Sequence, residues 1–506
     1  MEEKRLKKGN IFLLFLILSL GFFLRLYNLG SWGFWYDEVD SIFSGKFLIW
    51  HNILEVSIYT HWPGLFPFLL MRLWKYLGDG EFILRLLPLI FGILSIFAIY
   101  KIGGLLFNIK TGLISAFILC VSPFHIYYSQ ELRHYTLLTF LSLMAFFYLI
   151  QSLRSNKLCY WFGLIIFTAF SLNTHNVAIF LLIVENIFFI FFYKRYKSLL
   201  KRWLVSQLFI ILFFLPHFAA IFGQTVNYQI SNPFSVYPAA NHLFNFIQSF
   251  IIFNSGYNSV KAIQFLAVLL FTPLFFLGIM DKNKKEEICL LLCWLFIPII
   301  LTSVLTILIT HVYLFRTLVH ISAAYYILIA YGISKLKPRN VYLFVLFGYA
   351  FLAGLGLKNY YQNYFPLPEF PYRIAVHPKK ETRVAASYIE NNFQKKDLIG
   401  HTNPVTYLPF FYYHKDGFEE KLFTLGYFTN FYSVYAKVLK FVKMQPVDIR
   451  ELTKIKYDRI WLVFSSSENN QLDQRSKNIK DYFDRNYDMV ESKEFVGIRI
   501  YLYEVK

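Results

Sequence analysis

Three carboxylates lie within four residues near the beginning of the chain, in the segment Trp35-Tyr36-Asp37-Glu38-Val39-Asp40. Carboxylates this close repel one another unless they bind a cation, share a proton or act on a substrate. Because a long apolar run precedes them, they lie where the chain leaves a hydrophobic environment. We therefore treat Asp37, Glu38 and Asp40 as candidates for catalysis or cation binding. The alternative is an acidic loop that is simply solvated.

Two further segments combine residue types that could act on a substrate. The first begins at Ser122-Pro123 and continues to Gln130-Glu131-Leu132-Arg133-His134-Tyr135. Proline inside an apolar helix is expected to kink it, and Glu131 and Arg133 then follow near the helix end. Their simpler interpretation is an ion pair at the membrane interface. The second segment is His61-Trp62-Pro63-Gly64, for which the alternative is a capped helix with an aromatic anchor.

The composition indicates what kind of scaffold must position these residues. Of 506 residues, 57% are hydrophobic and 16% charged, with a formal net charge of +19. Soluble domains are about 25% charged, so most of this chain is expected to contact lipid or its own core. The basic residues punctuate hydrophobic runs instead of forming one patch, which favours membrane topology signals over nucleic-acid binding. None of the 4 cysteines follows Cys293, so no disulfide framework is expected in the last third.

About eleven segments are long and apolar enough to be predicted as membrane-spanning helices, since roughly 20 apolar residues cross a bilayer. The predicted spans are residues 11–29, 82–101, 109–127, 135–152, 160–174, 176–193, 203–223, 260–280, 287–309, 317–334 and 340–357. The shorter run 65–77 contains Arg72 and Lys75, and we predict a helix that lies in the interface.

The distribution of Lys and Arg predicts the orientation. With 65–77 excluded from the spans, nearly all even-numbered connections are basic and share a side with the N-terminal MEEKRLKK. By the positive-inside rule, this side is cytoplasmic. The long loop 30–81 then faces outward, as does the tail from residue 358.

The tail has a different composition from the rest of the chain. It is more charged and contains turn signals at Asn403-Pro404 and Lys415-Asp416-Gly417. We predict a helical transmembrane domain over 1–357 and a small extracytoplasmic α/β domain over 358–506. The predicted strands of this domain are 459–464 and 497–504, and the predicted helices are 380–393 and 476–482.

The order of the motifs resembles one family. An acidic motif follows the first span, and a His-x-Pro precedes an interfacial helix. Next come Leu-Arg-Leu-x-Pro at Leu84–Pro88 and Ser-Pro…Tyr-Ser-Gln-Glu-x-Arg-x-Tyr at 122–135. This order resembles the membrane glycosyltransferases of the GT-C fold, in the branch of protein O-mannosyltransferases, aminoarabinose transferases and Rgt-type sugar transferases. The resemblance covers roughly residues 30–220. It departs at Trp62, where the family often has proline, and at Thr317, where it often has tyrosine.

The resemblance implies transfer of a single sugar from a polyprenyl-phosphate donor to an extracytoplasmic lipid glycan, polysaccharide or protein. Asp37 would be the base, Glu38 would orient it or contact acceptor or metal, and a single displacement would invert the anomeric carbon. No cofactor is required, although Asp37, Glu38, Asp40 and Glu131 could supply oxygen ligands to a divalent metal. The residues expected to bind substrate or phosphate are Arg133, Arg316, His61, Glu131, His134 and Lys46.

Two other classes of function are weighed against this one. A transporter or flippase would place charges and broken helices at the bilayer midplane and show paired halves, whereas here the acidic motif lies in an outward loop. A sensor or scaffold that works through its C-terminal domain would not need the loop carboxylates. The transferase interpretation accounts for more of the motifs and places the protein in the cell membrane as a multi-pass protein.

Overall fold

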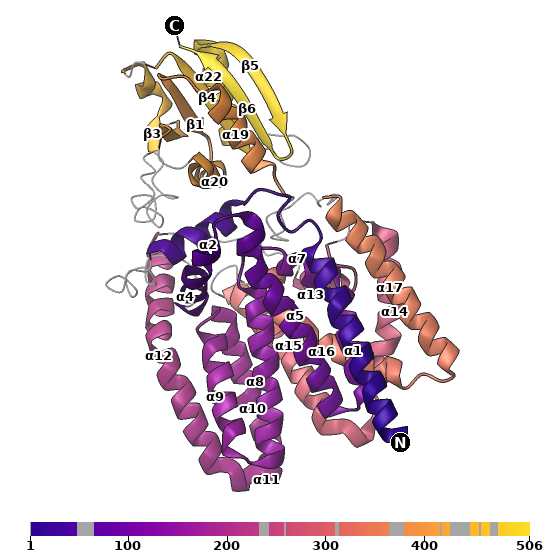
Figure 1. Ribbon diagram of the computed structural model, residues 1–506. Helices are drawn as coiled ribbons and strands as arrows, with labels where there is room; N and C mark the ends of the chain where they lie inside the picture. The colour runs from indigo at the N-terminus through magenta and orange to yellow at the C-terminus, as the bar shows by residue number, and fades with distance from the viewer. Residues whose placement is uncertain are drawn as a thin grey trace.

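The computed structural model describes most of the chain. It describes residues 2–47, 65–231, 242–257, 260–308, 313–363, 379–414, 417–425, 446–454, 457–465 and 474–505. Within these ranges the chain forms a helical bundle that carries a small mixed α/β domain at one end (Figure 1). The chain begins at the far end of the bundle from this domain.

Every segment that we predicted to span the membrane is helical. The helices are α1 (Glu2–Leu26), α5 (Glu81–Leu106), α6 (Ile109–Val121), α7 (Pro123–Ser129), α8 (Tyr135–Ser155), α9 (Leu158–Leu172), α10 (Ile179–Phe191), α12 (Leu200–Ser231), α14 (Lys261–Ile279), α15 (Lys285–Leu308), α16 (Val319–Ser334) and α17 (Arg339–Tyr361). Their apolar side chains form one large core. Shorter elements join them: α11 (Tyr193–Tyr196), α13 (His242–Ser255), η2 (Asn176–Ala178), η3 (Lys197–Leu199), η4 (Lys282–Lys284) and η5 (Phe315–Leu318).

The number of spans is smaller than predicted when each helix is judged by its own length. Within the described residues, 8 helices are long and apolar enough to cross a membrane, and 9 if the bent pair α6–α7 is one span. Two predicted spans, α9 and the segment Asn176–Phe191, are shorter apolar helices. They lie within the bundle beside α8 and α12 (Figure 1).

The bend between α6 and α7 is positioned by a buried arginine. The two helices differ in direction by 62°, and Ser122 caps the second by accepting from His125 N. Arg25, from α1, donates to the carbonyls of Leu119 and Cys120 at 3.0 and 2.9 Å. A cation at a helix C-terminus satisfies carbonyls that have no partner in the helix. The predicted kink at Pro123 is therefore a stabilised break, which places residues 130–134 at the outer end of the bundle.

Two short helices lie at this outer end. They are α2 (Tyr36–Phe47), which contains the three carboxylates, and α4 (Leu65–Trp74), which continues as η1 (Lys75–Leu77). The helix predicted at 65–77 is therefore present. Both lie on the side of the bundle that faces the α/β domain (Figure 1).

The C-terminal domain is a six-stranded sheet with helices on both faces. The strand order is β3-β2-β1-β4-β6-β5, with β3, β2, β1 and β4 parallel and the last two antiparallel. Helices α19 and α20 cover one face and α22 the other. The bounds are α19 (Thr382–Asn392), β1 (Asp397–His401), α20 (Pro404–His414), β2 (Glu420–Thr424), β3 (Pro446–Asp448), η6 (Ile449–Lys454), β4 (Arg459–Ser465), α22 (Gln474–Asn486), β5 (Asp488–Phe495) and β6 (Ile498–Glu504). The predicted α/β fold of this region is thus correct.

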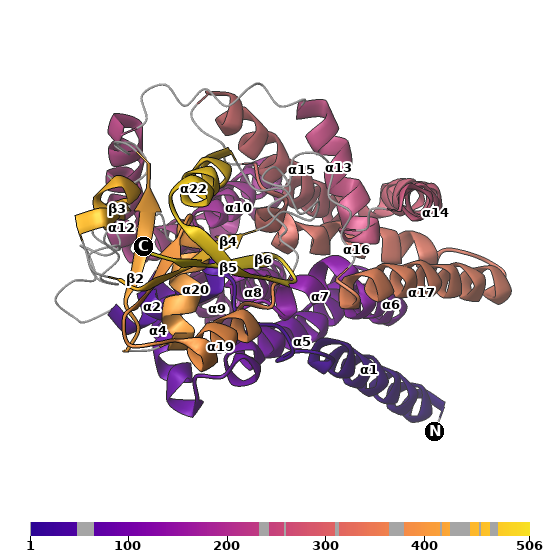
Figure 2. The ribbon, with the colours of Figure 1, turned by 90° about the horizontal axis from the view of Figure 1, so that it is seen from above.

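A small separate core joins this domain to the bundle. Tyr407 and Leu408 of α20 pack with Val39 and Ile42 of α2, and Leu84 of α5 belongs to the same cluster. Seen from above, the sheet lies over α2, α4 and α8 and leaves α14 and α17 uncovered (Figure 2). The α/β domain therefore rests directly on the helix that carries the carboxylates.

Candidate active site

Asp37 lies in the first turn of α2, between two arginines from distant parts of the chain. Arg316 donates from Nη1 to Asp37 Oδ2 at 3.0 Å, and Arg133 Nη2 lies 3.9 Å from the same oxygen. Arg133 also donates to the Asp37 carbonyl and to Ser41 Oγ. The Asp37 side chain keeps 18% of its exposure, so the carboxylate is accessible. The fold therefore brings together three of the residues selected from the sequence.

Glu38 points away from Asp37 and is fully engaged. Its two oxygens accept from Arg85 Nε and Nη2 at 2.8 and 2.7 Å, and Oε1 also accepts from Leu132 N at 2.9 Å. Arg85 uses its remaining donors on the carbonyls of Leu29, Trp32 and Gly33. A bidentate pair of this kind fixes geometry strongly. Glu38 is thus placed to hold α2 against the segment that contains Glu131 and Arg133.

Glu131 and Asp40 are buried carboxyls with raised pKa values. Burial, together with the nearby charges of Glu38 and Asp37, raises the pKa of Glu131 to about 8. Its Oε2 is buried and has no hydrogen-bond partner among the described residues. Burial also raises the pKa of Asp40 well above its usual value. Glu131 is therefore mainly protonated at neutral pH, whereas Asp37 is paired with arginine.

His134 is buried where α8 begins, with its ring 4.9 Å from that of His175. Burial, followed by the nearby charges of His175 and Arg133, lowers the pKa of His134 well below its usual value. A neutral imidazole cannot act as a cationic phosphate ligand, but it can still donate one hydrogen bond. Its Nε2 has no partner in the described part of the chain, so it could make that bond.

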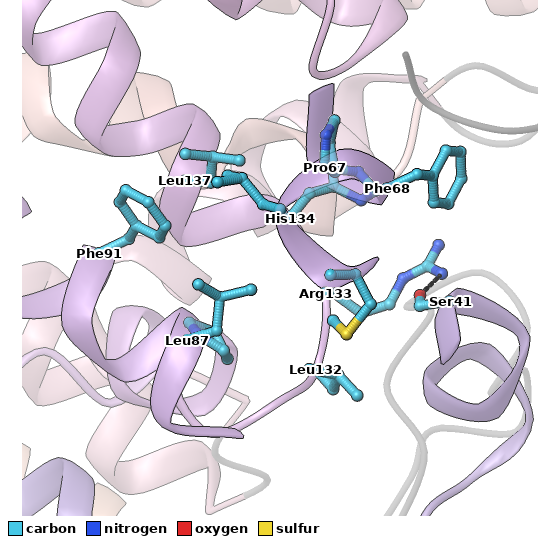
Figure 3. A pocket seen from close by; sticks show the side chains of 12 residues that line it. Ser41, Pro67, Phe68, Leu87, Phe91, Leu132, Arg133, His134 and Leu137 are labelled. Atoms are coloured by element: carbon cyan, nitrogen blue, oxygen red, sulfur yellow. Dashed lines mark hydrogen bonds between the residues drawn. The ribbon is translucent and has the colours of Figure 1, made fainter. Parts of the chain in front are cut away.

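An apolar pocket opens directly beside Arg133. It has an empty volume of about 450 Å³ and lies between α2, α4, α5 and α8. Figure 3 shows His134, Leu137, Phe91, Leu87 and Leu132 around it, with Arg133 reaching toward Ser41 at one end. A hydrophobic space with a guanidinium at its end suits a molecule with an apolar tail and an anionic head.

A second pocket, with more charged side chains in its lining, is formed by other residues of the same two segments. Its empty volume is about 350 Å³. It is lined by Gly33, Trp35, Glu38, Arg85, Tyr127, Gln130, Glu131, Tyr360, Lys379 and Lys380. The segments 35–41 and 130–134 therefore contribute to both pockets, and Asp37 lies beside Arg133, which lines the apolar one.

The remaining predicted site residues are His61, Lys46 and the possible metal ligands. His61 lies outside the described residues, and for Lys46 only the backbone is described, as part of α2. Within the described ranges, no group of three or more His, Cys, Asp or Glu side chains is arranged to hold a metal ion. Of the four carboxylates named as metal ligands, Glu38 already has both oxygens engaged.

Several site residues were not selected from the sequence. Arg85 belongs to the Leu84–Pro88 motif but had no assigned role, and its burial beside Glu38 follows only from tertiary packing. Lys379 and Lys380 lie after α17, where no motif indicated a site. Tyr413 of α20 donates to Glu81 Oε1 at 2.7 Å, and Phe34 N donates to the Tyr413 hydroxyl at 2.6 Å. For Lys379 and Lys380, the available signal in the sequence was that two lysines are adjacent in the segment before α19.

Comparisons with known proteins identify the class of fold. Residues 62–219 match the family model described as dolichyl-phosphate-mannose-protein mannosyltransferase. The crystal structure of apo ArnT from Cupriavidus metallidurans is 12% identical and superposes with a TM-score of 0.63, covering 98% of each chain. ArnT from the same organism bound to undecaprenyl phosphate is 11% identical, with a TM-score of 0.61 over 96% of this chain and 97% of that one. No curated protein sequence matches the chain.

The protein thus has the fold of the GT-C membrane glycosyltransferases. It is a multi-pass membrane protein, and the likeness to ArnT extends over the C-terminal domain as well as the bundle.

Proposed function

We propose that this protein transfers a single hexosyl or pentosyl residue from a polyprenyl-phosphate donor to an acceptor outside the cytoplasm. The observation that carries the proposal is Asp37, an accessible carboxylate held between Arg316 and Arg133, the second of which lines an apolar pocket. A base and a phosphate clamp at one point are what this reaction requires. The fold supports the proposal, and so does the polyprenyl phosphate bound to ArnT.

Asp37 would act as the base. The acceptor hydroxyl oxygen attacks the anomeric carbon, its proton passes to Asp37, and the bond from that carbon to the phosphate oxygen breaks. The polyprenyl phosphate leaves with the electron pair and needs no general acid, because a phosphate is already a stable anion. Attack from the side opposite the leaving group inverts the anomeric carbon.

The arginines would bind the donor phosphate. In the structure, Arg316 and Arg133 both face Asp37. A donor phosphate would draw these guanidinium groups toward itself, because it offers them more oxygens and more charge. Asp37 would then be free to accept the proton. The apolar pocket beside Arg133 would hold the first prenyl units of the donor.

The topology that fits this reaction has the N-terminus in the cytoplasm and residues 358–506 outside, in the cell membrane. Two observations support it: the basic connections predicted to be cytoplasmic, and the position of the α/β domain at the end of the bundle opposite the N-terminus (Figure 1). Asp37 would then face the outer surface, where a lipid glycan, a polysaccharide or a protein could be the acceptor.

The test is transfer by the purified protein and by Asp37→Asn. Each is incubated with labelled polyprenyl-phosphate sugars and an extract of host membranes, and both donor loss and acceptor labelling are measured. We expect the variant to lose at least about 100-fold in rate, the usual contribution of a general base.

Asp79→Asn is the matched control, since Asp79 is an exposed carboxylate whose side chain pairs only with Lys75 among the residues that the structure describes. It should keep the wild-type rate. Equal rates for Asp37→Asn and wild type would remove Asp37 as the base. An absence of donor loss with every polyprenyl-phosphate sugar would overturn the transferase proposal.

A further inference from the structure

The polar pocket contains two lysines that no carboxylate neutralises directly. Lys379 and Lys380 begin the described part of the chain that leads into α19, and both line the pocket. Neither ammonium group has a carboxylate oxygen within 4.0 Å among the described residues. Lys380 Nζ donates to Ser465 Oγ at 2.5 Å, and Lys379 Nζ lies over the Tyr360 ring, 4.5 Å from its centroid.

The backbone holds Lys379 in place although no carboxylate in the described part of the chain pairs with its ammonium group. Lys379 N donates to Asn363 Oδ1, and Asn363 Nδ2 donates back to the Lys379 carbonyl, at 2.8 and 2.9 Å. This pair of bonds ties the lysine to the end of α17. A surface lysine would keep its charge in water, whereas this one is fixed against an aromatic ring inside a pocket. Burying an ammonium group without a paired charge costs free energy, and a bound anion would offset that cost.

The ionisable groups of the pocket have shifted pKa values that favour binding of an anion. Burial and the nearby Arg85 lower the pKa of Lys379 to about 7, and burial lowers that of Lys380 to about 8. A bound anion would raise both values again. Opposite the lysines, the Glu131 carboxyl is mainly protonated at neutral pH, with its buried Oε2 unpartnered. A protonated carboxyl can donate a hydrogen bond to an anion instead of repelling it.

We propose that the pocket formed by Lys379, Lys380 and Glu131 binds an anionic group, a phosphate or a carboxylate, on the sugar acceptor. The inference rests on the transferase function proposed above and adds to it the chemical class of the acceptor.

The position of the pocket assigns it to the acceptor and not to the donor. The apolar pocket and its arginine already suit a lipid phosphate, and the polar pocket shares no lining residue with it. The segments 35–41 and 130–134 contribute to both pockets, and Leu132 N joins them by donating to Glu38 Oε1 at 2.9 Å. An acceptor held by its charge in the polar pocket would therefore lie next to the segment that carries Asp37 without competing for the lipid pocket.

The experiment measures binding without turnover. The full chain in detergent is mixed with glucose 6-phosphate, glucuronate or glucose, and contact is followed by saturation-transfer difference NMR. We expect signals from the phosphate probe, the carboxylate probe or both, and none above background from glucose. In the double variant Lys379→Gln/Lys380→Gln, binding should weaken at least about tenfold.

Two variants keep the result interpretable. Lys395→Gln/Lys477→Gln removes two exposed lysines of the same domain and should bind like wild type. Lys379→Arg/Lys380→Arg keeps both charges and should retain binding, which separates loss of charge from misfolding.

The relative signals of the two anionic probes distinguish a phosphate site from a carboxylate site. Equal signals from glucose and the anions, or anion binding that survives loss of both lysines, would overturn the proposal. No donor is present, so a failure of the transferase function would leave this result unaffected.

Discussion

The four carboxyls of the site differ in their surroundings, and their surroundings separate their roles. Asp37 is accessible and paired with arginines that a phosphate could attract. Glu38 is 1% exposed and fully bonded to Arg85 and Leu132 N. Burial raises the pKa of Asp40 well above its usual value and that of Glu131 to about 8. Residue type and spacing alone could not distinguish these environments, because each depends on partners from other helices.

Glu38 is therefore expected to act through position and not through contact with the substrate. Arg85→Met would leave the Glu38 charge buried and unpaired, which typically costs about 3–5 kcal/mol, so the melting temperature should fall sharply. Arg85→Met combined with Glu38→Leu removes both charges and should recover part of the loss. Thermal unfolding in detergent, followed by tryptophan fluorescence, measures the difference. If the double variant is less stable than Arg85→Met, the unpaired charge of Glu38 is not the cause of the stability loss.

At the scale of helices and strands, the sequence predicted most elements because hydropathy reports lipid exposure directly. All eleven apolar segments are helical, and Pro123 marks a real break. Arg25 could not be recognised as the group that caps this break, since its partners are carbonyls nearly 100 residues away. In the C-terminal domain, the strands β4 and β6 were predicted, whereas β1, β2, β3 and β5 and the contact of the domain with α2 were not. Packing between distant elements leaves no periodic signal.

The C-terminal sheet contains a buried group of charges that should make its stability depend on pH. Glu420 of β2 lies between His414 of α20, at 2.5 Å, and His401 of β1, at 3.3 Å. Burial alone would lower the pKa of His414. Its hydrogen bond to Glu420 and the charge of Glu420 raise that pKa instead, with a smaller contribution from Glu390. Burial lowers the pKa of His401. Burial alone would raise the pKa of Glu420, but its two histidine partners lower it.

The sign of each shift defines the expected pH profile. The stabilisation from His414 is complete below the ordinary histidine value of about 6.5 and is lost as pH rises through its raised pKa. The contributions of His401 and Glu420 are lost as pH falls through their lowered pKa values. The domain should thus be most stable near pH 6.5, as measured by thermal unfolding between pH 4 and 9. His414→Gln should abolish the decline on the alkaline side, and an unchanged decline would exclude His414 as its cause.

At the scale of the whole molecule, the α/β domain completes the site instead of merely being attached to it. It supplies Lys379 and Lys380 to the polar pocket and packs α20 against α2. Arg383 of α19 also pairs with Glu81 of α5 at 3.0 Å. Because α2 carries Asp37, the position of the candidate base depends on how the domain sits on the bundle. We infer that the domain holds α2 in the geometry needed for transfer.

Tyr413 is the residue through which this coupling can be tested. Its hydroxyl bridges Phe34 N, just before α2, and Glu81, at the start of α5. Tyr413→Phe would remove the bonds of Phe34 N and Glu81 Oε1, while Glu81 Oε2 keeps its pair with Arg383, and an unsatisfied buried group costs about 1–3 kcal/mol. We expect faster hydrogen exchange in α2 and roughly tenfold slower sugar transfer, because small displacements of reacting groups cost rate.

The control removes a tyrosine hydroxyl of the same domain that lies away from the bundle. Tyr388 donates to Glu491 at the exposed edge of the sheet, so Tyr388→Phe loses a comparable bond with no link to α2. It should leave both the exchange of α2 and the transfer rate unchanged. If Tyr413→Phe loses activity while α2 stays as protected as in wild type, the hydroxyl acts on the substrate or the domain, and not by holding the helix. If both variants behave like wild type, α20 and its apolar contacts alone suffice to position α2.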